Sequence, residues 1–324
     1  MGITSNPYRL LSIDLLRIFL ACIVCILHFD WHFIPQGYLA VEIFFILSGF
    51  FFSKKDFNST KQNNFILYFT KRIKTIYYWY ILACICYIIF IYKNFSLHII
   101  LNALLLWPQI GISQAWGCGS WWFIGVYIYV YILYLGLFYS LNKQLSIFIT
   151  GIIVFLSIGI LYHQTPVHCL NFTNELFLFG MSFGMLRGFL AFGIGILLGV
   201  ININIPQKQA ISISILFILL ILYIMTHNVS PVYDFLIYPI SCIGIIHLYN
   251  IKLKHKLYII NNISIIMYLF HIIIIQLMSS NIKSFFNKYI ILYLAFIIFI
   301  SLAITILNTL AKFLLHKIKL IKIQ

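Results

Sequence analysis

The chain has 324 residues, of which 63% are hydrophobic and only 8% are charged, and its mean hydropathy is +1.04. Soluble domains carry roughly 25% charged residues, so this composition excludes an ordinary soluble fold. The formal net charge of +15 does not indicate a nucleic-acid partner, because that role requires a basic face on a soluble surface.

A transmembrane helix needs about 20 apolar residues, and the chain offers about ten such stretches with mostly short connections. The expected spans, in chain order, are residues 10–29, 37–53, 75–92, 121–141, 145–162, 188–203, 210–226, 232–250, 259–280 and 289–311. The apolar stretch 97–110 is short and contains Pro108, so we expect an interfacial or re-entrant helix there. The sequence predicts one all-α polytopic transmembrane helix bundle over residues 1–324.

The cations are divided unequally between the two sets of connecting segments. If the N-terminus is cytoplasmic, the cytoplasmic segments hold Arg9, Lys54, Lys55, Lys61, Lys71, Arg72, Lys74, Lys143, Lys208, Lys252, Lys254, Lys256, Lys312, Lys317, Lys319 and Lys322. The outer segments hold Lys93, Arg187, Lys283 and Lys288. Cytoplasmic loops of membrane proteins carry the excess of Lys and Arg. Both termini are therefore predicted to be cytoplasmic.

The first span carries three ionisable residues at bilayer depth. Arg17 and His28 share one helix face, about 16 Å apart along the axis, because each residue advances about 100° and 1.5 Å. Asp14 precedes Arg17 by one turn, which favours an ion pair. Such residues usually face the protein interior and mark function. Alternatively, Asp14 and Arg17 only anchor the helix end near the cytoplasmic headgroups, which would leave His28 unexplained.

Three successive segments form a recognisable pattern. Residues 13–29 read IDLLRIFLACIVCILHF, residues 37–55 read GYLAVEIFFILSGFFFSKK, and residues 68–80 read YFTKRIKTIYYWY. They combine an Arg and a His separated by ten residues, an acidic residue before Phe-Phe and Ser-Gly-Phe, and a basic entry to a third helix. This series resembles the membrane acyltransferase 3 family, although the proline usual near the end of the third segment is absent.

Later segments carry a weaker likeness to the same family, at WWFIGVYIYVY from Trp121 and SIIMYLFHIII from Ser264. The resemblance implies transfer of an acyl group, usually acetyl from acetyl-CoA, to a hydroxyl of a polysaccharide, lipopolysaccharide or lipid-linked glycan precursor. It implies a multi-pass protein of the bacterial cytoplasmic membrane. The partners would be acyl-CoA, the glycan acceptor and membrane lipids, with no permanently bound cofactor. No His/Glu spacing resembles a zinc motif.

Acyl transfer to a hydroxyl suggests a role for each charged residue. A base must deprotonate the acceptor, and histidine suits that task near neutral pH, so His28 is the candidate base. Coenzyme A carries phosphates, which the guanidinium fork of Arg17 would bind. Lys71, Arg72 and Lys74 either extend this anion site or serve membrane topology alone.

The second span and the loop before it add three candidates. Glu42 begins near the depth of His28, where it would orient His28 or hold the acceptor, or is merely a charge tolerated at the interface. Ser48 is either a small packing residue beside Gly49 or an acyl-accepting nucleophile. His32 follows the first span closely and is a candidate substrate ligand.

Later residues are less specific. His271 is a second candidate for proton handling or substrate contact, with Tyr268 one turn before it, or else a hydrogen-bonded core histidine. Trp122 belongs either to an interfacial aromatic belt or, with nearby tryptophans, to a sugar-stacking platform. Cys118 and Cys169 both fall in outer segments, where they would either pair or stay free.

Two other function classes stay open. Intramembrane His, Glu and Arg also serve proton-coupled transport, so a transporter or flippase of a glycan precursor is an alternative. The chain lacks the paired half-repeats with broken helices that transporters show. A structural subunit of a glycan-synthesis complex would leave the shared face of Arg17 and His28 unexplained. Consumption of acetyl-CoA by the purified protein discriminates between these classes.

Overall fold

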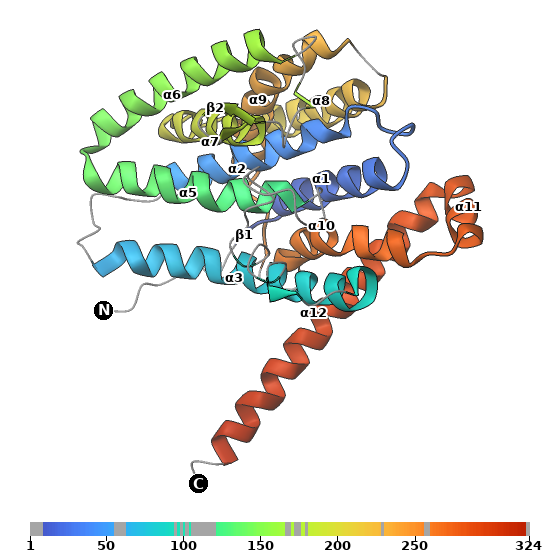
Figure 1. Ribbon diagram of the computed structural model, residues 1–324. Coiled ribbons are helices and arrows are strands. Elements are labelled where there is room, and N and C mark those ends of the chain that lie inside the picture. Colours follow the sequence, from blue (N-terminus) through green and yellow to red (C-terminus); the bar gives the residue numbers. More distant parts are fainter. Residues whose placement is uncertain are drawn as a thin grey trace.

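The fold was analysed in a computed structural model (Figure 1), which describes residues 9–54, 63–93, 96–97, 100, 104, 121–165, 170–171, 176–178, 181–227, 230–255 and 260–321. The helical segments are α1 (Leu11–Phe29), η1 (Gly37–Leu39), α2 (Ala40–Ser53), α3 (Asn63–Tyr87), η2 (Ile88–Tyr92), α5 (Trp122–Ser140), α6 (Lys143–Gln164), α7 (Phe183–Val200), α8 (Gln207–Thr226), η6 (Pro231–Leu236), α9 (Ile237–Asn250), α10 (Ile260–Leu277), α11 (Ser280–Lys288) and α12 (Ile290–Ile321). Two short antiparallel ribbons pair β1 (Arg9–Leu10) with β4 (Lys254–His255), and β2 (Leu176–Leu178) with β3 (Met181–Ser182).

The prediction of a helical membrane protein is confirmed. Eight helical segments in the described part of the chain are long and apolar enough to cross a bilayer, and Gly37–Ser53 and Asn262–Leu277 are shorter apolar helices. Each of the ten predicted stretches lies on one of these segments. The expected interfacial helix at 97–110 falls almost wholly outside the described residues.

Local sequence sets where several helices begin. Asn142, Ser182 and Ser279 each accept a hydrogen bond from a backbone N–H three residues later, and so cap α6, α7 and α11. Pro206 directly precedes α8, where its missing N–H interrupts no helical hydrogen bond. The cap at Ser182 starts α7 five residues before the predicted span. The assignment of Arg187 to an outer segment is therefore wrong, because Arg187 lies in the second turn of α7.

The helices alternate in direction between two ends of the molecule. At one end, here called the basic end, β1 pairs with β4, Lys54 Nζ donates to Ile201 O at 3.1 Å, and Ile205 N donates to Asn250 Oδ1 at 3.2 Å. At the opposite end, Gln36 N donates to Met225 O at 3.2 Å. Figure 1 shows most of the helices running side by side between these ends, with α11 at the opposite end and α12 slanting away from the bundle.

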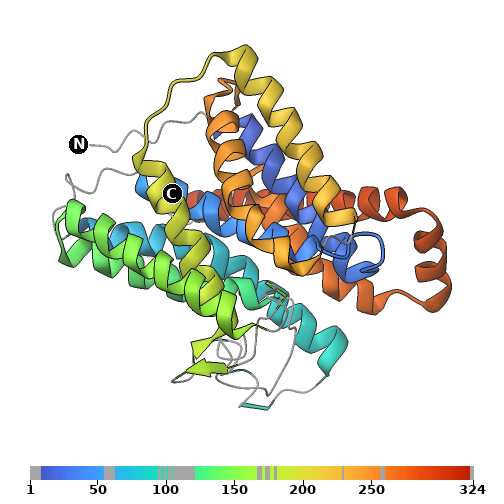
Figure 2. The same cartoon turned by 90° about the horizontal axis from the view of Figure 1, so that it is seen from above.

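A parallel pair of helices, α2 and α7, forms the middle of the bundle. Figure 2 shows α5 and α6 on one side of this pair, with α8 and α9 on the other. A Cβ added to Gly49 would lie 2.0 Å from Phe192 O, and one added to Gly195 would lie 2.1 Å from Ile46 O. The two backbones therefore approach so closely that only glycine fits at either contact, as in small-residue pairs of other membrane helices.

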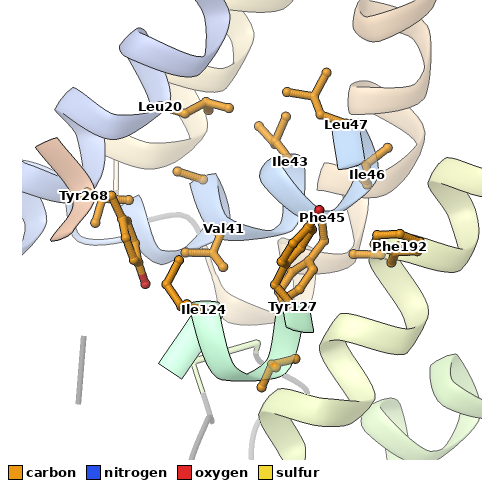
Figure 3. Packing of buried hydrophobic residues seen from close by; sticks show 14 of the residues in the cluster. Leu20, Val41, Ile43, Phe45, Ile46, Leu47, Ile124, Tyr127, Phe192 and Tyr268 are labelled. Carbon is orange, nitrogen blue, oxygen red and sulfur yellow. The ribbon is translucent and has the colours of Figure 1, made fainter. Parts of the chain in front are cut away.

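Aromatic side chains of α2, α5 and α7 pack around these close contacts. The ring of Phe45 on α2 packs edge-on against Phe123 of α5, with the centroids 4.6 Å apart. Figure 3 shows Phe45 of α2, Tyr127 of α5 and Phe192 of α7 in this region, and the centroids of Tyr127 and Phe192 are 6.3 Å apart. The rings of Tyr134 and Phe192 stack at 5.4 Å. The glycines allow the two backbones to come together in one register, and the packing of the aromatic rings stabilises it.

We expect Gly195→Ala to destabilise the protein and Gly159→Ala to leave it unchanged or more stable. The first methyl meets the backbone of α2 at 2.1 Å, whereas nothing lies within 4 Å of the second. Overpacking costs about 1–3 kcal/mol, and Gly to Ala in an open helix position favours folding by up to about 1 kcal/mol. Thermal unfolding of both variants in the same detergent measures the difference, and equal unfolding midpoints would contradict the tight α2–α7 contact.

Candidate active site

The charged face of α1 is built as the sequence predicts. Arg17 Nη1 donates to Asp14 Oδ1 at 2.8 Å, and Asp14 is only 3% exposed. The Arg17 guanidinium also lies over the ring of Phe51, 5.3 Å from its centroid. Asp14 therefore holds the guanidinium in place, and this agrees better with a protein-facing role than with an anchor at the headgroups.

A cavity of about 110 Å³ adjoins Arg17 and is lined by five helices, α1, α2, α3, α5 and α10. The lining residues that carry polar groups are Arg17, Ser48, Ser264 and the two tyrosines Tyr127 and Tyr268, and the other lining residues are apolar. The structure thus brings together three candidate residues that are distant in sequence. The cavity has room for a few water molecules, and is small beside the roughly 300–1,000 Å³ of ligand sites that enclose a drug-sized molecule.

Two histidines meet at the other end of the same face of α1. The rings of His28 and His271 stack with their centroids 5.1 Å apart. His28 is exposed, whereas His271 is completely buried. His271 Nδ1 lies 2.7 Å from Tyr268 O, a carbonyl that can only accept, so Nδ1 carries the proton. The lone pair of neutral His271 is then on Nε2, which is buried and has no hydrogen-bond partner within the described part of the chain.

Tyr268 connects the cavity with the histidine pair. Its side chain lines the cavity beside Arg17, and its ring centroid is 6.1 Å from that of His271. Arg17, Tyr268, His271 and His28 therefore follow one another from the cavity toward the opposite end of the molecule. We call these four residues the α1–α10 track.

Glu42 is part of a separate, fully buried network. Its Oε1 accepts from Arg187 Nε at 2.7 Å and lies 2.6 Å from Arg187 Nη2, and its Oε2 accepts from Tyr238 at 3.0 Å. Arg187 is 0% exposed and lies over the ring of Trp122, 4.7 Å from its centroid. The expectation that Glu42 orients His28 is not met, because both carboxylate oxygens are engaged with α7 and α9.

A second buried carboxylate, Asp234, has its own set of hydrogen-bond donors near the opposite end. Asp234 accepts hydrogen bonds from Gln36 at 2.9 Å, from Tyr38 at 2.8 Å and from the backbone N–H of Leu170 at 2.8 Å. Two segments far apart in the sequence, at residues 36–38 and at Leu170, are thereby joined to η6 directly before α9. Sequence reasoning missed Arg187, Tyr238 and Asp234, although a charge in an apolar run was the signal that identified Arg17.

The remaining predicted residues lie apart from the track. His32 is exposed and bound to Asp30 at 2.7 Å, and this hydrogen bond lowers the pKa of the Asp30 carboxyl. Trp122 is buried, and Arg187 covers its ring, so the sugar-stacking platform at Trp122 is not supported. Lys74 is exposed on α3, and the side chains of Lys71 and Arg72, like Cys118 and Cys169, lie outside the described structure.

The ion pair between Glu42 and Arg187 should matter for stability. Arg187→Met leaves a buried carboxylate without its cation, which costs about 3–5 kcal/mol. Glu42→Leu combined with Arg187→Met removes both charges and should be less destabilised than the single Arg187→Met variant. Denaturant titration in mixed micelles measures the free energies of unfolding, with the exposed Lys74→Met as a control. A double variant that is destabilised as much as Arg187→Met, or more, would show that the two side chains are not coupled.

Comparison with known proteins gives one match. Residues 10–309 match a family model described as an acyltransferase domain. No curated protein and no solved structure matches the chain. The matched range covers most of the chain and includes all four residues of the track. The chain therefore belongs to the acyltransferase 3 family and is a membrane acyltransferase.

Proposed function

We propose that the protein transfers an acetyl group from acetyl-CoA to a hydroxyl of a polysaccharide, lipopolysaccharide or lipid-linked glycan precursor. The observation that carries this proposal is the α1–α10 track, in which a guanidinium at a cavity leads through Tyr268 to a pair of histidines. The anionic donor needs a cation such as the guanidinium, and the acceptor hydroxyl needs a base such as a histidine. Coenzyme A is a substrate here and not a resident cofactor.

The geometry supports a division of labour along α1. Arg17 and His28 are about 16 Å apart along the helix axis, too far to act on one atom. Extended coenzyme A spans such a distance, with a phosphate at Arg17 and the thioester near the histidines. The cavity is too small for the whole donor. It suits a slender part of the donor, and the nucleotide stays toward the basic end.

The transfer itself needs one base. His28, exposed at the end of the track, takes the proton of the acceptor hydroxyl. The resulting alkoxide attacks the thioester carbonyl and the carbon–sulfur bond breaks. The leaving sulfur takes the proton that His28 holds, so coenzyme A departs as a thiol and His28 is neutral again. His271 lies behind His28 with its Nδ1 proton held by a backbone carbonyl, which fixes the orientation of the ring.

Substitution at the two ends of the track should separate donor binding from turnover. Arg17→Ala should weaken acyl-CoA binding about 10- to 100-fold, the range for one lost hydrogen bond to a charged group. His28→Ala should bind the donor nearly as well and lose turnover by roughly 10²–10⁴-fold. Calorimetry with coenzyme A and single-turnover transfer measure the two effects, and His227→Ala, an exposed histidine at the end of α8, is the control. If His28→Ala loses donor binding as Arg17→Ala does, His271 becomes the candidate base.

We also propose ten spans in the bacterial cytoplasmic membrane, with the basic end and both termini in the cytoplasm. The alternating helix directions and the Lys residues at the basic end support this orientation. In a variant without the seven native cysteines, Lys283→Cys should react with an impermeant thiol reagent in intact cells. Lys208→Cys should react only after permeabilisation. The reverse labelling pattern would show that the basic end, where the nucleotide of the donor is proposed to lie, faces the outside.

A further inference from the structure

A second, larger cavity lies far from the histidine pair. It is a groove of about 520 Å³ between the first half of α1, residues 211–219 of α8, the end of α9 and the chain that follows α9. Its walls include Leu15, Phe19, Ile215, Leu219 and Leu253, and every lining residue is apolar except Ser12 and Ser214. The groove runs along the helices, and therefore in the direction of a lipid chain in the bilayer.

The groove does not belong to the proposed acyl-transfer track. Leu15 and Phe19 are two residues either side of Arg17, so they point about 160° away from it on α1. A lipid-linked acceptor held in this groove would have α1 between its sugar and His28. This position argues against the reaction acceptor as the occupant and in favour of a lipid that stays bound.

Charges at the mouth of the groove favour an anionic headgroup. Lys208 is exposed one turn before the lining residue Ile211, and Lys252 is exposed between the lining residues Ile251 and Leu253. The strand pair of β1 and β4 closes the same end. No acidic residue occurs in the segments 201–210 or 250–256 around this mouth. Cationic residues beside an apolar groove are the pattern by which membrane proteins bind anionic lipids.

A buried hydroxyl inside the groove provides a second, independent observation. Ser214 is 4% exposed, lines the groove, and its Oγ makes no hydrogen bond to any residue that the structure describes. The hydroxyl of Ser12, by contrast, donates to Leu248 O at 2.8 Å. Ser214 lies about 9 Å below Lys208 along α8. A diacyl phospholipid carries ester carbonyls between its phosphate and its chains, and such a carbonyl would accept from Ser214.

We propose that this groove binds one anionic phospholipid. Its acyl chain occupies the apolar space between α1 and α8, its phosphate lies at Lys208 and Lys252, and an ester carbonyl accepts a hydrogen bond from Ser214. The lipid fills the groove between α1 and α8, and so holds the charged helix against the rest of the bundle. This inference does not depend on the proposed reaction.

Lipid retention by purified protein tests the proposal. The protein is purified from membranes, exchanged into detergent with equal amounts of phosphatidylglycerol and phosphatidylcholine, and its bound lipids are counted by native mass spectrometry. Ile215→Trp, which fills the groove, should lose the bound phosphatidylglycerol. Leu216→Trp, the next residue along α8 and 62% exposed outside the groove, should retain it.

The headgroup contacts are tested in the same way. Lys208→Ala and Lys252→Ala should each weaken phosphatidylglycerol retention about fivefold, since one cation near an anionic lipid contributes about that much. Lys283→Ala at the opposite end should change nothing. The proposal is wrong if Ile215→Trp retains as much phosphatidylglycerol as Leu216→Trp does. It is also wrong if the unsubstituted protein retains phosphatidylcholine and phosphatidylglycerol equally. A change of oligomeric state in Ile215→Trp without loss of lipid would instead assign the groove to a second copy of the chain.

Discussion

The arrangement of this protein depends on the cost of placing an ionisable side chain inside a membrane. Arg187 and Glu42 are both fully buried in helices, and each is tolerated there because it is bonded to the other. Their pairing requires α2 and α7 to lie parallel in one register. Gly49 and Gly195, which lie farther toward the basic end on the same two helices, allow the close approach that this register requires. Packing and electrostatics therefore specify the same arrangement.

α2 connects this buried pair with the α1–α10 track. Glu42 points to α7 and α9, while Phe44 and Ser48 line the cavity beside Arg17. Phe44 and Ser48 are four residues apart and share a face of the helix. One face of α2 is thus fixed by the bundle and another forms a wall of the candidate site. Loss of the ion pair would therefore change the position of the cavity wall as well as the free energy of unfolding.

Sequence reasoning predicted the apolar helices well because each is an unbroken hydrophobic run, and it predicted the Asp14–Arg17 pair because one helix turn sets that distance. The apolar pattern misplaces the start of α7 after Arg187, because the serine that caps this helix, Ser182, lies before the uninterrupted apolar run. Sequence reasoning named His28 and His271 separately. That their rings stack depends on how α1 packs against α10, which no local pattern reveals. The pairing of Glu42 with Arg187 likewise depends on how α2 packs against α7, and no local pattern reveals it.

The most direct test of the α1–α10 track is a cryo-electron-microscopy structure of the protein with a thioether analogue of acetyl-CoA, which cannot transfer its acetyl group. We expect a phosphate of the analogue at the guanidinium of Arg17, its pantetheine arm beside Tyr268, and its sulfur next to the rings of His28 and His271. Density for the analogue at another face of the bundle, with the track empty, would contradict the assignment of donor and base to these residues.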